Sequence, residues 1–236
     1  MADPRWLTVA DDETPVAGSL LAYLEAADRE FVFGLGMPRT FGTGDILVRQ
    51  GDPTDHVFVI RFGWVRVFSS TANGHEILVA LRGPGDAVGE LAALHGWQRT
   101  ASIQTLEPVG TVQLTSGQLE ACLRQRPAVA LALIRQMSQR LREAENARAD
   151  FAALDVAQRV AAFLSRLAQQ HGVPGRDGLV LHMPLSQQDI ANRVGASRRA
   201  VARSLAVLRE RKIITTSRRR IVIVAPTVLE AFAHAD

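Results

Sequence analysis

Short apolar runs separated by glycine turns occupy the chain from Arg39 to Leu123. The pattern recurs in FGTGDILVRQGD, HVFVIRFGWVRVFSS, TANGHEILVALRGPGD and TASIQTLEPVGTVQL. Runs rich in Val, Ile and Phe with alternating faces favour strands, and Asn73-Gly74 is a strong β-hairpin signal. Many short, evenly spaced strands are typical of a closed antiparallel barrel or jelly roll. We therefore expect such a barrel here.

Helical patterns flank this stretch. Residues 17–35 predict one short amphipathic helix, because Leu20, Leu21, Leu24 and Ala27 have helical spacing. After Pro127, apolar residues alternate in steps of four and three, as in a coiled-coil seam: Ala130, Ile134, Met137, Leu141 and Ala144, extended by Phe151 with Arg148 as an exception.

A helix over residues 127–150 would be about 36 Å long. Its seam can pack on its own barrel or pair with the same helix of a second chain. We favour a homodimer, since one small barrel cannot easily cover so long a seam. Farther on, residues 155–170 predict another amphipathic helix with Asp155 as N-cap, HGVPGRDG predicts a loop, and LVLHM predicts a short strand.

Two helices with a tight turn are predicted in LSQQDIANRVGASRRAVARSLAVLRERKI. Ser186 and Ser197 are suitable N-caps, and Asp189 favours the first helix N-terminus. Gly195 falls where the turn needs a positive φ, and Ala191 is small where the helices must cross. Together these features predict a helix-turn-helix.

The second helix has a buried stripe of Val201, Leu205 and Leu208, and its other face is basic. IITTSRRRIVIV then predicts two short strands around a basic tip, which forms a wing. Arginine side chains at the N-terminal end of such a helix are suited to guanine in the major groove. We expect double-stranded DNA to contact Ser186, Gln187, Gln188, Ser197, Arg198, Arg199, Arg203, Arg218, Arg219 and Arg220.

Charge is distributed unevenly along the chain. From Ser186 to Arg220 there are ten Lys and Arg against two acidic residues, which gives +8, whereas the whole chain carries +3. The remainder therefore carries −5. A cationic C-terminal part beside a mildly acidic remainder favours a polyanionic partner.

Composition argues against several other classes. Cys122 is the only cysteine, so one chain holds no disulfide or four-cysteine metal site. No apolar run approaches the roughly 20 residues of a membrane span, and we expect a cytoplasmic protein without membrane contact. A metal-dependent cupin-like enzyme would need clustered ligands, but His56, His75 and His95 are dispersed. We expect no enzymatic activity, bound metal or cofactor.

The segment GELAALHGWQRTAS, Gly89–Ser102, places a glutamate and an arginine among apolar residues. With the barrel, long helix and winged helix-turn-helix, it resembles the superfamily of the cyclic-AMP receptor protein and the Fnr regulators, over residues 27–225. The resemblance implies an α+β fold: an N-terminal extension (1–26), a cyclic-nucleotide-binding β-roll or jelly roll (27–126), a dimerisation helix (127–150) and a winged helix-turn-helix domain (151–236).

By this resemblance the segment is a phosphate-binding cassette. Arg99 would neutralise the nucleotide phosphate and Glu90 would accept the ribose 2′-hydroxyl proton, the ligand bridging the two charges. Gly89 would let the backbone approach, and N–H groups at Leu91 and around Ala101 would complete the cradle. On this reading, Arg99→Ala would abolish binding and leave the fold intact. A structural Glu–Arg ion pair without ligand is the alternative.

The base is left open between cAMP and cGMP. Thr100 resembles a position that meets guanine in cyclic-GMP-binding domains. In receptor-protein-like chains, a Thr-Ser pair on the long helix contacts adenine. The similarity of the flanking segments MSQRLREAEN and LDV to those chains places this pair at Ala144 and Glu145. A carboxylate at Glu145 could accept guanine N–H groups, and Arg140 belongs to the same expected ligand-contacting set.

The resemblance implies a dimeric transcription regulator controlled by this effector, with RNA polymerase as a partner if it activates. The family pattern has Arg-Glu where this chain has Arg198-Arg199, so the glutamate that would read cytosine is replaced by Arg199. The operator of this protein can therefore differ from the family's TGTGA half-site. Ligand-independent DNA binding, or a different effector, is the alternative.

Overall fold

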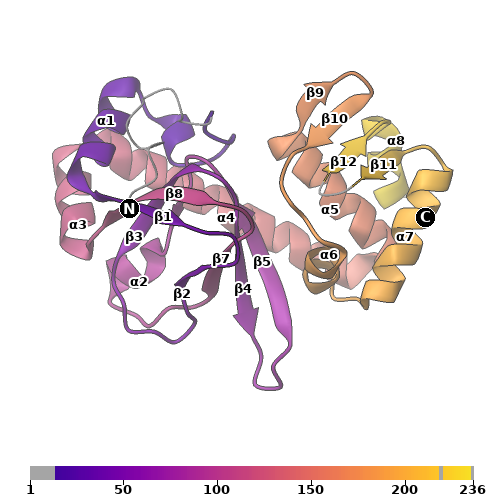
Figure 1. Ribbon diagram of the computed structural model, residues 1–236, viewed down its shortest axis with the longest axis horizontal. Coiled ribbons are helices and arrows are strands. Elements are labelled where there is room, and N and C mark those ends of the chain that lie inside the picture. Colours follow the sequence, from indigo (N-terminus) through magenta and orange to yellow (C-terminus); the bar gives the residue numbers. More distant parts are fainter. Residues whose placement is uncertain (1–13, 218–219, 235–236) are drawn as a thin grey trace. The chain divides into compact units, whose positions relative to one another are not determined.

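The computed structural model describes residues 14–217 and 220–234. The chain forms two compact units, Met1–Arg140 and Leu141–Asp236, and their boundary falls inside one helix (Figure 1). Within the described residues, no helix is both long enough and apolar enough to span a bilayer.

Strands in the first unit form two four-stranded antiparallel sheets, which build the predicted β-roll (Figure 1). Their orders are β1-β8-β3-β6 and β2-β7-β4-β5. The strands are β1 (Met37–Phe41), β2 (Ile46–Val48), β3 (Val57–Phe62), β4 (Val65–Ser70), β5 (Glu76–Arg82), β6 (Ala87–Val88), β7 (Ser102–Thr105) and β8 (Val109–Leu114). Asn73-Gly74 lies in the turn between the antiparallel β4 and β5, so the predicted hairpin is confirmed.

The predicted helix over residues 17–35 is wrong in one respect, because it is broken in two. A 3-10 turn η3 (Leu21–Tyr23) is followed by extended backbone at Leu24 and Glu25, and helix α1 (Ala26–Leu35) then begins. Leu20, Leu21 and Leu24 are all buried in the core of the roll. The break lets this short segment bury all three leucines, which outweighs the local helical preference.

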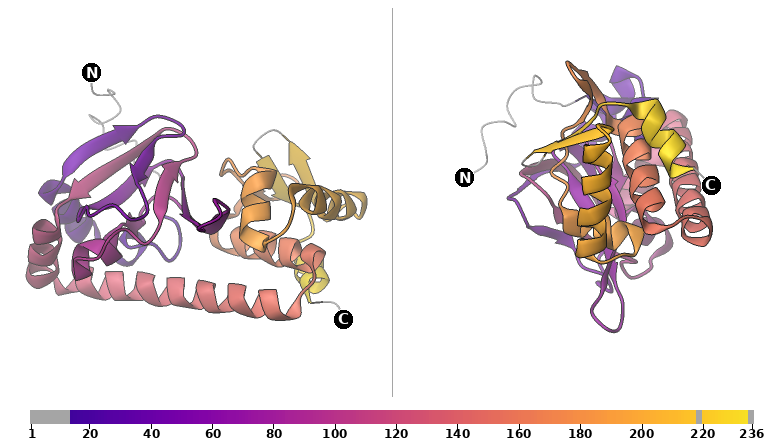
Figure 2. Two further views of the ribbon diagram at one scale, coloured as in Figure 1. Left: turned by 90° about the horizontal axis from the view of Figure 1, so that it is seen from below. Right: turned by 90° about the vertical axis from the view of Figure 1, so that its right-hand side faces the viewer.

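Helix α3 (Ser116–Gln125) starts at a capping box formed by Thr115 and Gln118. Helix α4 (Pro127–Ala153) follows, and its first position is proline, whose missing N–H has no intrahelical role there. Figure 2 shows α4 as one continuous helix. Its first half packs against the roll through Val129, Ala132, Leu133 and Gln136.

The Gln136 side chain is 1% exposed and joins α4 to two other segments. Its Oε1 accepts hydrogen bonds from the backbone N–H of Leu20 at 3.0 Å and of Ala87 at 3.1 Å. The backbone at the N-terminal turn and at β6 is thus fixed to the long helix.

The face of α4 that meets the roll differs from the predicted seam. Ile134 is 59% exposed and Leu141 is 63% exposed, while Met137 is partly buried against the core of the roll. The alternative in which this seam packs on its own barrel therefore fails at Ile134, where the side chain is left uncovered within one chain.

The second unit contains α5 (Val156–His171), with Asp155 in a capping box with Gln158, which confirms the predicted cap. Its four-stranded sheet has the order β11-β12-β10-β9. The remaining elements are β9 (Val173–Gly175), β10 (Gly178–Leu181), α6 (Gln187–Val194), α7 (Arg198–Glu210), β11 (Ile214–Ser217), β12 (Arg220–Ile223) and α8 (Pro226–Ala233). The prediction of a loop over HGVPGRDG is wrong, because β9 pairs with β10 as a hairpin.

Candidate functional site

The predicted cassette begins where β6 ends. Gly89 has φ +84° and precedes the short helix α2 (Glu90–His95). A Cβ at this position would lie 2.7 Å from Nη1 of Arg99 and 3.2 Å from the carbonyl oxygen of His56. Glycine is required here both by its left-handed conformation and by the close approach of the arginine.

Arg99 is 3% exposed and forms three hydrogen bonds within the roll. Its Nε donates to Thr54 Oγ1 at 2.8 Å, Nη1 to the Gly89 carbonyl at 2.8 Å and Nη2 to the His56 carbonyl at 2.6 Å. Burial lowers the pKa of Arg99, against the opposing field of nearby carboxylates, first Asp55. The guanidinium therefore joins three loop segments of the roll.

This role corrects one expectation. Replacing Arg99 with alanine would remove a donor from two partly buried carbonyl groups, those of His56 and Gly89, of which Gly89 keeps the N–H of Ala93 at 3.4 Å. This substitution should therefore disturb the fold as well as ligand binding. Arg99 is part of the structure of the cassette and cannot be treated as a side chain that serves the ligand alone.

Glu90 is 5% exposed and has its own partner, Arg140 of α4. Arg140 Nη1 lies 2.9 Å from Glu90 Oε1, and its Nη2 lies 3.3 Å from Asp86 and donates to the Ala87 carbonyl at 2.7 Å. Burial alone would lower the pKa of Arg140, but the carboxylates of Glu90 and Asp86 raise it above its ordinary value. Glu90 is thus neutralised within the chain by Arg140.

The expectation that a ligand must bridge Glu90 and Arg99 therefore needs correction, because each side chain already has partners in this fold. The alternative of a Glu–Arg ion pair is realised with a different arginine, Arg140. Sequence reasoning named Arg140 only as a ligand contact, and it missed Asp86 altogether. The signal was weak, since an acidic residue in a GPGD turn usually serves that turn, as Asp86 Oδ2 does by accepting from Gly83 N–H.

The remaining predicted ligand contacts are placed as follows. Thr100 is exposed directly after Arg99, while Leu91 and Ala101 are partly buried. Ala144 and Glu145 are exposed on the part of α4 that belongs to the second compact unit. Their roles toward a ligand stay predictions.

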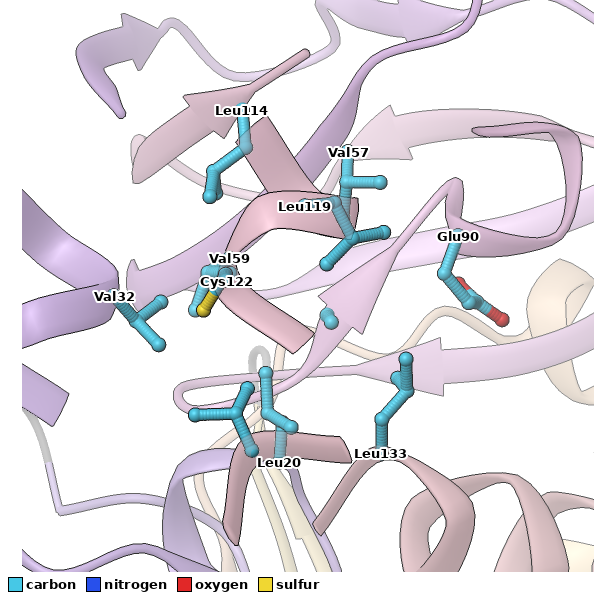
Figure 3. Close-up of a pocket in the computed structure, with 11 residues that line it drawn as sticks. Leu20, Val32, Val57, Val59, Glu90, Leu114, Leu119, Cys122 and Leu133 are labelled. Carbon is cyan, nitrogen blue, oxygen red and sulfur yellow. The ribbon is translucent and has the colours of Figure 1, made fainter. Parts of the chain in front are cut away.

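A small cavity lies beneath the cassette (Figure 3). Its volume is about 10 Å³, enough for one water at most, so it is not a nucleotide pocket. Figure 3 shows the Glu90 carboxyl group at one edge and apolar side chains around the rest. Those side chains are Leu20, Val32, Val57, Val59, Ala87, Leu114, Leu119, Cys122, Val129 and Leu133.

Metal chemistry gets no support from the described residues, where no group of three or more His, Cys, Asp or Glu is placed to hold an ion. Cys122 is buried, and burial raises the pKa of its thiol, as expected for a small core residue.

The second candidate site is the predicted helix-turn-helix, formed by α6 and α7. Ser186 caps α6 in a capping box with Asp189, and Ser197 caps α7 by accepting from the Ala200 N–H. Gly195 ends α6 with φ +62°, and a Cβ there would lie 2.6 Å from the Phe151 ring. The predicted caps and turn glycine are confirmed.

The two faces of α7 differ sharply. Val201, Leu205 and Leu208 are at most 2% exposed, whereas Arg198, Arg199 and Arg203 are exposed. From residue 198 to residue 209 the helix carries no acidic residue. Its outward surface therefore offers arginine N–H donors without a carboxylate acceptor.

The predicted wing is present as β11 and β12, which pair in antiparallel register. Arg209 Nη1 donates to Thr216 Oγ1 at 3.1 Å and so links α7 to the wing. Arg220 is exposed, while Arg218 and Arg219 lie outside the described residues. Of the polar residues at α6, Gln188 is exposed and Gln187 is partly buried.

Comparison with known proteins identifies both units. Residues 38–126 match the family "Cyclic nucleotide-binding domain" and residues 158–232 match the family "Crp-like helix-turn-helix domain". The roll and the capped, winged helix-turn-helix thus define a transcription regulator that combines a domain of the cyclic nucleotide-binding family with a Crp-like helix-turn-helix domain.

Similar proteins narrow this class. The chain is 34% identical over 169 residues to a "CRP-like cAMP-activated global transcriptional regulator" of Mycobacterium tuberculosis (strain ATCC 25618 / H37Rv), covering 72% of this chain and 75% of that protein. It is 30% identical over 192 residues to a "Global nitrogen regulator" of Nostoc sp. (strain PCC 7120), covering 80% and 86%. The chain belongs to the Crp/Fnr superfamily of transcription regulators, and these relatives are regulators rather than enzymes.

Solved structures agree on the fold. A CooA mutant from Carboxydothermus hydrogenoformans superimposes with a TM-score of 0.75 at 20% identity, covering 94% of this chain and 96% of that one. The c-di-GMP-responsive regulator CLP of Xanthomonas campestris gives a TM-score of 0.72 at 22% identity, covering 84% and 99%. The predicted α+β architecture of roll, long helix and helix-turn-helix is confirmed.

Proposed function

We propose that this protein is a cytoplasmic, homodimeric, sequence-specific DNA-binding regulator whose DNA affinity is set by a cyclic mononucleotide in the β-roll. The observation that carries this proposal is the cassette: Gly89 in a left-handed conformation, Glu90 buried at the start of α2, and Arg99 buried against Gly89. The cAMP-activated regulator of Mycobacterium tuberculosis supports a cyclic nucleotide over other effectors.

The cassette retains the groups that an anion and a hydroxyl need. Arg99 uses three of the five N–H donors of a guanidinium, which leaves two for phosphate oxygens. Glu90 accepts from Arg140 through Oε1, and Oε2 has no hydrogen bond within the described residues. That oxygen can accept from the ribose 2′-hydroxyl. Exposed Thr100 would lie toward the base, with cAMP and cGMP as the two candidates.

Control can pass through Arg140. This residue lies on α4 and holds Glu90 and Asp86 of the cassette. A ligand hydroxyl on Oε2 would share the Glu90 carboxylate with Arg140 on Oε1, weaken that ion pair and so change how the roll holds α4. A differential affinity for two arrangements of α4 is what allosteric control requires.

The exposed seam of α4 supports the dimer. Ile134 and Leu141 lie seven residues apart on one helix face, and each exposes more than half of its side chain. Pairing with the same seam of a second chain would bury both. Two recognition helices could then address half-sites about 34 Å apart.

The recognition face favours guanine. With Arg198, Arg199 and Arg203 exposed and no acidic residue among positions 198–209, α7 has no carboxylate to accept from cytosine N4. We expect a half-site with more guanine contacts than TGTGA, and RNA polymerase as a further partner if the protein activates transcription.

Calorimetric titration of the purified dimer with cAMP and cGMP tests the effector. Micromolar binding that Glu90→Gln weakens at least ten-fold, with the exposed neighbour variant Gln98→Ala unchanged, would support the cassette. Thr100→Ala should weaken cGMP and spare cAMP if the hydroxyl meets guanine. No binding of either nucleotide to the folded dimer would refute nucleotide control.

Selection from a random DNA library, with and without nucleotide, tests the DNA interface. Arg199→Ala with Arg203→Ala should remove specific binding, and Arg176→Ala, an exposed arginine between β9 and β10, should not. Specific binding that survives the double change would contradict the assignment of α7.

Light scattering tests the seam. Ile134→Glu should yield monomers, whereas Ile77→Glu, at a position with similar exposure on β5, should leave the mass unchanged. A monomeric wild-type chain at micromolar concentration would rule out the dimer.

The second candidate function is DNA binding without nucleotide control, or with another effector. The intramolecular partners of Glu90 and Arg99 favour it, because they satisfy both charges without ligand. Equal operator affinity with and without each nucleotide would select this function.

A further inference from the structure

His56 directly precedes β3 and lies beside Arg99 of the cassette. Its backbone carbonyl accepts a hydrogen bond from Arg99 Nη2 at 2.6 Å, and Thr54 Oγ1 accepts from Arg99 Nε at 2.8 Å. Residues 54–56 therefore line one side of the guanidinium that would hold the nucleotide phosphate. We propose that the His56 imidazole makes nucleotide binding depend on pH, with an affinity that rises as the pH falls. This inference rests on the proposed function.

The imidazole ring has a defined position in the roll. It is partly buried and meets the Phe58 ring edge-to-face, with 4.9 Å between the ring centres. Phe58 is itself buried in a core cluster of the roll, and it meets the Phe41 ring edge-to-face at 5.6 Å. The imidazole is thus packed against a fixed aromatic partner and stays near the cassette.

The surroundings of the ring oppose its protonation. Burial is the largest cause that lowers the pKa of His56 below its ordinary value of 6.5. Within the described residues, three charged side chains also act on the ring: the cations Arg99, before β7, and Arg39, on β1, lower its pKa, and the carboxylate of Asp55 raises it. The Asp55 carboxylate is shared, because its Oδ2 also accepts from the Ser116 hydroxyl at 2.8 Å. The free protein therefore holds His56 mainly neutral near pH 7.

A bound nucleotide changes this balance. Its cyclic phosphate carries one negative charge, which at Arg99 would offset the positive charge that opposes protonation of His56. The pKa of His56 is then higher in the complex than in the free protein, so binding takes up part of a proton. Neither cAMP nor cGMP changes its own charge near neutral pH, so the proton is taken up by the protein.

Linkage fixes the direction of the effect. Because the complex holds the proton more tightly than the free protein does, the affinity for nucleotide rises as the pH falls through the interval between the two pKa values of His56. Well above and well below this interval the affinity is constant. Histidine suits this role, since its charge changes in the physiological range of pH. At a fixed nucleotide concentration, the protein would therefore hold more ligand at the lower pH.

Calorimetric titration of the full-length protein with cAMP and with cGMP, at about pH 5.5 and about pH 8, measures this dependence. We expect an affinity about five-fold higher at the lower pH. His56→Gln should remove the difference, and it keeps the backbone carbonyl that accepts from Arg99. The control variant His75→Gln changes an exposed histidine between β4 and β5 and should keep the full dependence.

Proton uptake can be measured without any variant. Titration of the wild-type protein at about pH 6.5, in two buffers with different heats of ionisation, should give different apparent binding enthalpies, with the sign of proton uptake. The same titrations of His56→Gln should give equal enthalpies. Proton release by the wild-type protein, or no exchange of protons, would overturn the inference.

The outcomes separate this inference from the proposed function. Nucleotide binding with equal affinity at both pH values would contradict the role of His56 and leave the cassette assignment standing. A pH dependence that survives in His56→Gln would assign it to another group, and it would also contradict the inference. No binding of either nucleotide at either pH would overturn nucleotide control and this inference together.

Discussion

Removal of the Arg140 guanidinium should destabilise the roll more than any other single charge removal around the cassette. Arg140→Met keeps an apolar stem but leaves the carboxylates of Glu90 and Asp86, whose side chains are 6% and 7% exposed, without their cation. Loss of one partner from a buried ion pair costs about 3–5 kcal/mol. Because the Arg140 side chain is 18% exposed, we expect the lower end, about 3 kcal/mol.

A double-mutant cycle isolates the pair. Glu90→Gln alone should cost about 1 kcal/mol, because Arg140 keeps Asp86 and the Ala87 carbonyl. The double variant should lose about 2 kcal/mol rather than the sum of the two changes, since no charged Glu90 is stranded, which gives a coupling of about 2 kcal/mol.

Urea unfolding followed by tryptophan fluorescence measures these free energies for the roll alone. All three tryptophans, Trp6, Trp64 and Trp97, precede the second unit in the sequence, and Trp64 and Trp97 lie in the roll, so no tryptophan reports on the helix-turn-helix. If the losses of the two single variants add up to the loss of the double variant within about 0.5 kcal/mol, the argument that Arg140 stabilises the buried Glu90 carboxylate is refuted. A coupling of the expected size would establish the ion pair in solution.

Three further outcomes follow from single positions. Gly89→Ala should abolish nucleotide binding in calorimetry and lower the urea midpoint of the roll, because the new Cβ would lie 2.7 Å from Arg99 Nη1 at a φ of +84°. Burial lowers the pKa of His56, and the positive charge of Arg99 lowers it further. The unfolded chain therefore takes up this proton more readily than the folded one, so the free energy of unfolding should fall as the pH drops below about 6.5. His56→Gln should flatten this pH dependence in urea titrations. Leu208→Ala, at a fully buried position, should cost the second unit about 2–5 kcal/mol in thermal unfolding followed by circular dichroism. Val207→Ala, at the neighbouring position that is 36% exposed, should cost less than about 1 kcal/mol.

Local sequence signals predicted those parts of the fold whose causes are local. Ser186 and Gly195 specify the ends of α6 through a side-chain cap and a positive φ, and both need only neighbouring residues. Asn73-Gly74 specifies its hairpin in the same way. The break at Leu24 was not predictable by these means, because it depends on what the leucines meet in the core.

The site shows the same division. The cassette was found because its glycine, glutamate and arginine lie within one short segment. Their partners were not, since Glu90 meets Arg140 fifty residues later, and Arg99 meets the backbone of Gly89 and His56. No pattern in the sequence distinguishes a carboxylate that awaits a ligand from one that an arginine of another helix already holds.

That distinction decides how a nucleotide could act here. If Glu90 and Arg99 were buried without partners, a ligand would be needed for folding and could not act as a signal, because the free protein would be strongly destabilised. With Arg140 on Glu90 and backbone carbonyls on Arg99, both buried side chains have partners within the chain, so we expect folding not to depend on a ligand. A nucleotide then adds contacts at Glu90 Oε2 and at the two remaining N–H groups of Arg99. Only the difference between its binding free energies to two arrangements of α4 can shift that helix. Variants of Arg140 should therefore change the affinity for nucleotide and the response of DNA binding together, whereas variants of the exposed Thr100 should change affinity alone.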